Sequence, residues 1–144
     1  MTALDRQQGV ATAIIAALTG DPQLAVSIGR RIYDAPPPRA VLPSITLRVV
    51  SCVDRCSADT DAQLISVDLD VWDRYEPGVS LAGPRLVMAH IRRILHMRPL
   101  PAPAAAVLSV RCTGSFGPVR DPDDIALHGT VSVAVLCGHD ASLA

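Results

Sequence analysis

Two aspartates separated by one residue, Asp68 and Asp70, are the side chains best spaced for chemistry in this chain of 144 residues. A β-strand places residues i and i+2 on one face, so the two carboxylates would lie side by side. Such a pair can transfer protons or hold a hard metal ion. Arg48 and Arg111 are expected on flanking strands, and cross-strand ion pairs explain the same residues more simply. We therefore expect a structural ion-pair cluster at these positions.

The cysteines and histidines show no spacing that is typical of a metal or catalytic site. Cys52 and Cys56 have three residues between them, which alone is a weak zinc signal. His90 and His96 are six residues apart and would point to different sides of a helix. The chain also has no glycine-rich phosphate loop and no Gly-x-Ser-x-Gly element. We expect free thiols, no metal, no cofactor and no enzymatic activity; the alternative is a small metal-dependent enzyme or metal sensor that uses Asp68, Asp70, Cys52 and Cys56.

The segment 63–74 must position the two aspartates, and its residues alternate strictly in polarity. The apolar positions are Ile65, Val67, Leu69 and Val71, and the alternating positions are Ser66, Asp68, Asp70 and Trp72. This period of two predicts a strand with one buried face and one face toward water or a partner.

A second alternating segment, 44–51, precedes the first and is expected to pair with it as an antiparallel hairpin. The connection 52–62 is rich in Asp, Ser, Thr and Arg. We expect it to be a long polar loop that becomes ordered on a partner.

Helices are predicted on both sides of this hairpin. Apolar residues at helical spacing indicate a helix over 4–18, and Asp21 and Gly29 are suitable caps for a short helix over 23–28. The segment 30–43 contains Pro36, Pro37 and Pro38 and is expected to be a stiff extended arm. A third helix is predicted over 81–95, with Ser80 as its cap.

The C-terminal third indicates two more strands, over 106–115 and 128–137. In the first, Leu108, Val110 and Cys112 are expected on the buried face; in the second, Val131, Val133 and Val135 are. Turns are expected at 117–118 and 121–124. The chain is therefore predicted to be one α+β domain over 1–137, with an antiparallel or mixed four-stranded sheet, helices packed on one face, and a flexible tail over 138–144.

The other face of this sheet is the candidate contact surface, because the domain has no further helices to cover it. It would carry Arg48, Asp68, Asp70, Trp72, Ser109, Arg111, Thr130 and Ser132. The full set of expected interface residues is Tyr33, Arg48, Cys52, Arg55, Asp68, Asp70 and Trp72. Trp72 and Tyr33 are the expected anchors, since large amphipathic rings often dominate interfaces. Arg85 and Arg92 share one helical stripe and are expected to face DNA in a channel.

The composition limits the possible functions. The net charge is −1, which argues against a dedicated nucleic-acid-binding protein. The chain is 49% hydrophobic and 19% charged, which is typical of a folded domain with part of its surface covered by partners. The longest apolar stretch, 10–18, is too short to span a bilayer, so no membrane contact is expected. All thirteen basic residues are arginines, as in proteins of GC-rich genomes.

The order of motifs resembles the tail-terminator, or tail-completion, proteins of long-tailed bacteriophages and phage-like gene transfer agents. The resemblance covers most of the chain, from about residue 4 to 137. Its motifs are Gly29-Arg30-Arg31-Ile32-Tyr33-Asp34, Leu42-Pro43, Asp70-Val71-Trp72-Asp73, the helix 81–95, Asp121-Pro122-Asp123 and His128-Gly129.

This resemblance implies a structural subunit of a ring, commonly of six copies, that caps the tail tube and ends its growth. It further implies a tail tube protein on one face of the ring, a stopper or neck protein on the other, and transient non-specific contact with DNA in the channel. The expected location is the tail or neck of a virion or phage-like particle, after assembly in the bacterial cytoplasm. The alternative within this class is another neck component, such as a stopper, head-completion or minor tail protein.

Overall fold

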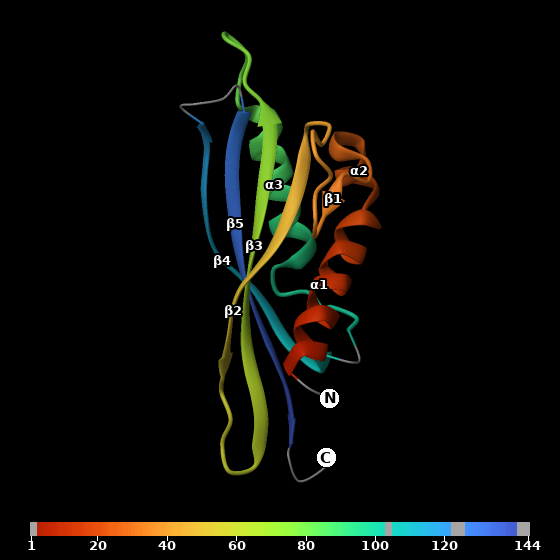
Figure 1. The fold of residues 1–144 in the computed structure, drawn as a ribbon, viewed down its shortest axis with the longest axis vertical. Helices are drawn as coiled ribbons and strands as arrows, with labels where there is room; N and C mark the ends of the chain where they lie inside the picture. Colours follow the sequence, from red (N-terminus) through yellow and green to blue (C-terminus); the bar gives the residue numbers. More distant parts are fainter. Residues whose placement is uncertain (1–2, 103–104, 122–125, 141–144) are drawn as a thin grey trace.

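The computed structural model describes residues 3–102, 105–121 and 126–140, and it confirms the α+β class. Figure 1 shows the arrangement of the elements. In chain order they are α1 (Ala3–Thr19), α2 (Pro22–Ile28), β1 (Ile32–Tyr33), β2 (Ser44–Asp54), β3 (Thr60–Arg74), α3 (Ala82–Leu95), β4 (Val107–Arg120) and β5 (Ala126–Asp140).

The strands form one mixed sheet of five strands in the order β1-β2-β3-β5-β4. The sequence-based count of four missed β1, which pairs in parallel with the start of β2 through Ile32↔Ile45 and Tyr33↔Thr46. All other neighbours are antiparallel. A strand of two residues has no alternation to detect, and it lies inside the segment that was predicted to be a proline-stiffened arm.

The β2–β3 hairpin is longer than predicted, and the expected 52–62 loop is wrong. Strand β2 continues to Asp54 and β3 starts at Thr60, so only 55–59 connect them. A bulge between Val49 and Ser51 shifts the register, after which Cys52 pairs with Ile65. Ladder hydrogen bonds extend the hairpin through polar residues, and polar composition alone does not reveal such bonds.

Strands β4 and β5 also extend past their predicted ends. β4 passes through Gly117-Pro118, where a turn was expected, with a register irregularity between Phe116 and Val119. β5 reaches Asp140, three residues into the predicted tail. Residues 122–125 of the predicted 121–124 turn and residues 141–144 of the tail lie outside the described residues.

One further prediction on β4 is wrong. Leu108 was expected to point into the core, but it sits at a register shift between Val107 and Ser109 and is 60% exposed. Val110 is buried as predicted, and Cys112 packs against the core.

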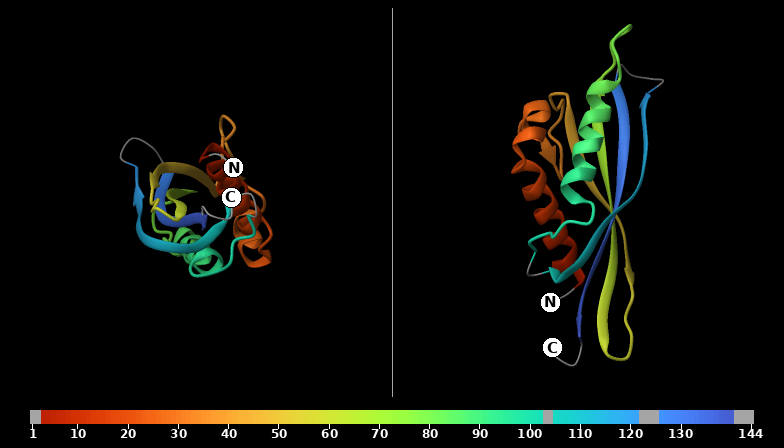
Figure 2. Two further views of the ribbon diagram at one scale, coloured as in Figure 1. Left: turned by 90° about the horizontal axis from the view of Figure 1, so that it is seen from below. Right: turned by 180° about the vertical axis from the view of Figure 1, so that it is seen from behind.

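The three helices lie on one face of the sheet, as predicted, and the core fills the space between the two layers (Figures 1 and 2). Apart from Leu108, the strands contribute their predicted inward residues, and the helices contribute apolar stripes at three- and four-residue spacing. The fully buried side chains include Val10, Ile14, Leu18, Leu24, Ile28, Ile45, Leu47, Ile65, Leu69, Ile91, Leu95 and Val135.

The short helix α2 forms as its caps predict. The Asp21 carboxylate accepts a hydrogen bond from the Leu24 N–H at 2.9 Å, and Gly29 ends the helix with φ +59°. At the start of α3, the Ser80 hydroxyl accepts from the Ala82 N–H at 3.1 Å.

Asp21 also fixes α2 to α3, because Arg93 Nη2 of α3 lies 2.8 Å from its Oδ1. This hydrogen bond holds the pKa of Asp21 at about 2, below its usual 3.8. A carboxyl group with a lowered pKa in the folded chain stabilises the fold above its unfolded pKa. That contribution disappears as the pH falls from about 4 toward 2.

We expect Asp21→Ala to lower the free energy of unfolding by about 1–2 kcal/mol at neutral pH. Asp21→Asn, which retains a cap acceptor, should cost less. Urea unfolding from pH 7 to about pH 2.5 should show the difference between wild type and Asp21→Ala shrinking below about pH 4. A difference that stays constant down to the lowest pH would refute this role.

The β2–β3 hairpin projects beyond the helical layer (Figure 1), and a buried arginine of α1 contacts the start of β3, just after the hairpin turn. Arg6 is only 2% exposed; its Nη2 lies 3.0 Å from Asp61 Oδ2 and its Nη1 donates to Gln63 Oε1 at 3.3 Å. Sequence reasoning missed this contact, although Arg6 lies four residues before Val10 on the stripe of α1 that faces the sheet.

Among the described residues, no single helix is both long and apolar enough to cross a membrane. The pair Arg6–Thr19 and Pro22–Ile28 reaches that length and composition only when taken together, and it is bent by 86°.

Candidate functional site

The three helices lie on one side of the sheet, and we call the side opposite them the outer sheet face (Figure 2). It carries four of the predicted contact residues: Arg48 on β2, and Asp68, Asp70 and Trp72 on β3. On both strands these residues alternate with buried neighbours, which directs them away from the helices. The sequence therefore predicted this grouping correctly.

The first row of contacts on the outer sheet face joins three strands. Arg48 Nη2 lies 3.1 Å from Asp68 Oδ2, and Ser132 of β5 donates its hydroxyl to Asp68 Oδ1 at 2.9 Å. The registers Arg48↔Asp68 and Asp68↔Ser132 place the three residues directly opposite one another. Because the Arg48 side chain is 61% exposed, this ion pair adds at most about 1 kcal/mol. Its main effect is to hold the side chains in fixed positions.

The second row centres on Asp70, which is only 8% exposed. Its Oδ1 accepts from the Thr130 hydroxyl at 2.8 Å and lies 3.1 Å from His128 Nε2. Arg48 Nε lies 3.8 Å from the other carboxylate oxygen and connects the two rows. The aspartates thus form the predicted cross-strand cluster around Arg48. The expectation that Arg111 flanks them is wrong, because Arg111 lies on β4, which pairs with β5 and not with β3, and no ion pair joins it to either aspartate among the described residues.

His128 is a member of the cluster that sequence reasoning missed. Its ring stacks on Trp72 with 4.2 Å between centroids and 12° between planes. A signal was present in the sequence, because His128, Thr130 and Ser132 alternate with the buried residues Gly129, Val131 and Val133. The register between β3 and β5 could not be read, however, since no tight turn joins these strands.

We expect Trp72 and His128 to be energetically coupled. A double-mutant cycle with Trp72→Ala and His128→Ala should give a coupling energy of about 0.5–1.5 kcal/mol in urea unfolding. Trp72→Ala with Ser132→Ala, four residues further along β5, is the matched control and should be additive. Equal coupling in both cycles would show that the stack contributes nothing specific.

The arrangement of the two aspartates favours an ordered structural surface. Both carboxylates contact basic or hydroxyl groups of neighbouring strands. Within residues 3–102, 105–121 and 126–140, no group of three or more His, Cys, Asp or Glu side chains is placed to hold a metal ion. The cysteines of the alternative metal site lie elsewhere: Cys52 packs against the core, and Cys56 lies in the hairpin turn, with its Sγ 3.4 Å from Asp61 Oδ1.

The remaining predicted contact residues are not gathered in the cluster. Tyr33 lies at the edge of the outer sheet face, opposite Thr46. Arg55 is exposed in the turn of the projecting hairpin. Cys52 points to the helical side with its register partner Ile65, so its predicted place in an exposed loop is wrong.

The proline segment lies beside the aromatic end of the outer sheet face. Pro36, Pro37 and Leu42 line one side of a hollow of about 350 Å³, and Asp70 and Trp72 line the other. Trp72 therefore lies between an ordered polar cluster and an apolar recess.

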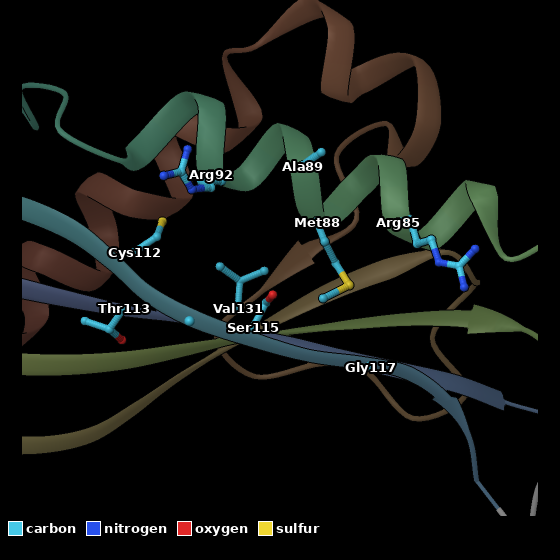
Figure 3. Close-up of a pocket in the computed structure, with 10 residues that line it drawn as sticks. Arg85, Met88, Ala89, Arg92, Cys112, Thr113, Ser115, Gly117 and Val131 are labelled. Atoms are coloured by element: carbon cyan, nitrogen blue, oxygen red, sulfur yellow. The ribbon is translucent and has the colours of Figure 1, made fainter.

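The two arginines predicted to face a channel lie on the opposite side of the sheet, where α3 packs beside the edge strand β4. Arg85 and Arg92 line a cleft of about 430 Å³, together with Met88, Ala89, Val131 and residues of β4 (Figure 3). The structure thus brings the two arginines together, away from the outer sheet face.

Two cysteines that pack in or beside the core, Cys112 and Cys137, have a thiol pKa above the ordinary value. Burial raises the pKa of Cys137 to about 11. Burial also raises the pKa of Cys112, against the opposing effect of Arg92, so its thiol stays neutral in the cleft.

The fold is shared with a chain in a solved structure titled "Virion of native gene transfer agent (GTA) particle". That chain has 14% sequence identity to this one and a TM-score of 0.75, and the match covers 89% of this chain and 93% of that chain. At this identity the likeness shows a common fold. No curated protein matches the sequence.

The sequence itself matches the family described as tail completion protein gp17 over residues 12–138. This match spans most of the chain and confirms the resemblance drawn from the motif order. The chain therefore belongs to the tail completion protein gp17 family, a family of structural virion tail proteins.

Proposed function

We propose that this chain is a subunit of a ring, of six copies, that caps the tail tube of a long-tailed phage or gene transfer agent particle. The ring ends tube growth and joins the tail to the head or neck, and DNA passes through its channel. Family membership supports a role in tail completion, and the virion chain with the same fold supports assembly with other particle proteins.

The outer sheet face is the observation that carries this proposal. A two-layer domain leaves one sheet face without a partner layer, and here that face holds an ordered cluster of ion pairs and hydrogen bonds from Arg48 to Trp72. Side chains already fixed in position lose little conformational entropy when a partner binds. The face is therefore suited to contact a neighbouring subunit or tail protein.

Two other elements supply further contacts in this proposal. The β2–β3 hairpin extends past the helices (Figure 1) and exposes Val50 and Val53, which are 54% and 45% accessible. The proline segment presents its recess beside Trp72. Both can reach a neighbour without any rearrangement of the core.

Light scattering of the purified chain, alone and with tail tube protein, tests whether a ring forms. We expect a species of six times the 15.2 kDa subunit mass in at least one of these samples. Arg48→Glu, which places like charges beside Asp68 and Asp70, should reduce the ring fraction, and Gln23→Glu on exposed α2 is the control. A monomer under all conditions would contradict the ring.

A further inference from the structure

The cleft between α3 and β4 has the features of a peptide-binding site. Arg85 and Arg92 are seven residues apart on α3, which separates them by two turns, about 10 Å along the helix. Between them the floor is apolar, made by Met88, Ala89 and Val131 (Figure 3). The opposite wall is the edge strand β4, with small residues at Gly114 and Ser115.

The edge of β4 is closed at one end of the cleft and open along it. At the closed end, the Met97 N–H donates to the Val110 carbonyl at 2.9 Å, and the Cys112 N–H donates to His96 Nδ1 at 3.0 Å. In the part of the chain that the structure describes, no further bond from outside the sheet reaches β4 between 113 and 117. An open strand edge of this kind can accept an additional strand.

The two arginines of the cleft lack an acidic partner within residues 3–102, 105–121 and 126–140. No ion pair joins Arg85 or Arg92 to an acidic side chain among the described residues. Arg93, on another side of the same helix, is paired with Asp21 at 2.8 Å. The cleft therefore presents two guanidinium groups, one at each end of its apolar floor, that can pair with the carboxylates of a ligand.

We propose that this cleft binds an extended acidic segment of a neighbouring virion protein. The segment adds a strand to the open edge of β4, packs apolar side chains on Met88 and Val131, and places carboxylates on Arg85 and Arg92. Because every second residue of an extended chain points the same way, carboxylates at positions i and i+4, about 13 Å apart, can reach the two long arginine side chains while the apolar side chain at i+2 packs between them. DNA is the less suitable ligand, since phosphates use neither the apolar floor nor the strand edge. Only the identification of the partner as a virion protein rests on the proposed function.

A defined peptide tests the inference on the full chain. The probe is a fluorescein-labelled peptide of sequence Thr-Asp-Thr-Val-Thr-Asp-Thr, in which both Asp side chains and the Val side chain lie on one face of the extended chain. The control peptide has Asn at each Asp. Fluorescence anisotropy should show binding of the acidic peptide, weakened at least tenfold by Arg85→Glu with Arg92→Glu. Arg111→Glu is the control for one such charge reversal outside the cleft, because Arg111 lies on the other face of β4, and it should alter affinity less than twofold; Arg85→Glu alone is the variant to compare with it.

The rate at which the Cys112 thiol is alkylated is a second, independent measure of peptide binding in the cleft. In a Cys52→Ser/Cys56→Ser variant at alkaline pH, where the Cys112 thiol is partly ionised, the acidic peptide should slow alkylation of Cys112, which lines the cleft. The inference is overturned if the acidic peptide does not bind, if the double variant binds as tightly as wild type, or if duplex DNA binds in the cleft and displaces the peptide.

The two proposals can fail separately. A ring that forms from wild-type chain but does not bind the peptide would overturn only the cleft inference. A chain that binds the peptide yet never assembles would overturn only the ring. Circular dichroism of each variant confirms folding, which exposed substitutions of this kind should leave intact.

Discussion

Leu69→Ala is expected to lower the free energy of unfolding by about 2–5 kcal/mol. Leu69 is fully buried at the centre of β3 and lies opposite Leu47 and Val131 in the two flanking strands. Truncation removes apolar contacts and leaves a cavity that neighbours from three strands cannot close. Urea unfolding with a two-state fit measures the loss.

Ser66→Ala, on the outer sheet face of the same strand, is the control for this change. It should alter stability by no more than about 0.5 kcal/mol. Equal losses for the two variants would mean that the faces of β3 are assigned the wrong way round.

Gly117→Ala should cost about 2–3 kcal/mol, although it adds a single methyl group. Gly117 has φ +80°, which side-chain-bearing residues rarely adopt, and an added Cβ would lie 2.7 Å from the His128 carbonyl oxygen. That neighbour is backbone of the paired strand, so it cannot move aside without disturbing β4–β5 pairing. Thermal or urea unfolding measures the effect.

Gly114→Ala is the control, because it adds the same methyl group to β4 at a position without the positive φ and the close backbone contact of Gly117. Gly114 lacks the positive φ, and nothing lies within 4 Å of an added Cβ. This variant should be neutral or slightly more stable. If Gly114→Ala lowers the free energy of unfolding as much as Gly117→Ala does, the effect at Gly117 cannot be due to its own backbone conformation and close contact.

The sequence predicted those parts of the fold that depend on periodicity. Ile65 to Val71 alternate because one face of β3 is buried, and Val87, Ile91 and Leu95 repeat because α3 lies on the sheet. Asp21 and Gly29 marked the ends of α2 by their capping chemistry. Each of these signals arises from a physical requirement that is local in the sequence.

Features fixed by pairing between distant segments could not be predicted. The two residues of β1, the extension of β2 through Cys52 to Asp54, and the passage of β4 through Gly117 all depend on hydrogen bonds to a neighbouring strand. Polar or glycine-containing segments read as loops when that neighbour is not known.

Among the candidate contact residues, too, positions set by local periodicity were predicted, and positions set by pairing between distant strands were missed. Arg48, Asp68, Asp70 and Trp72 were grouped correctly because strand alternation places them on one face. His128 was missed because its position opposite Trp72 depends on the β3–β5 register. The grouping of Arg85 and Arg92 followed from helical spacing, whereas the cleft beside them required the path of β4.

Negative-stain imaging of the purified chain mixed with tail tubes tests the central claim most directly. The account predicts a ring at one end of each tube and no further elongation after tube protein is added. Arg48→Glu should reduce the fraction of capped tubes, while Gln23→Glu should not. Tubes that bind no protein at their ends and continue to grow would contradict the proposed role, and binding only to a head or stopper preparation would assign the chain to another neck position.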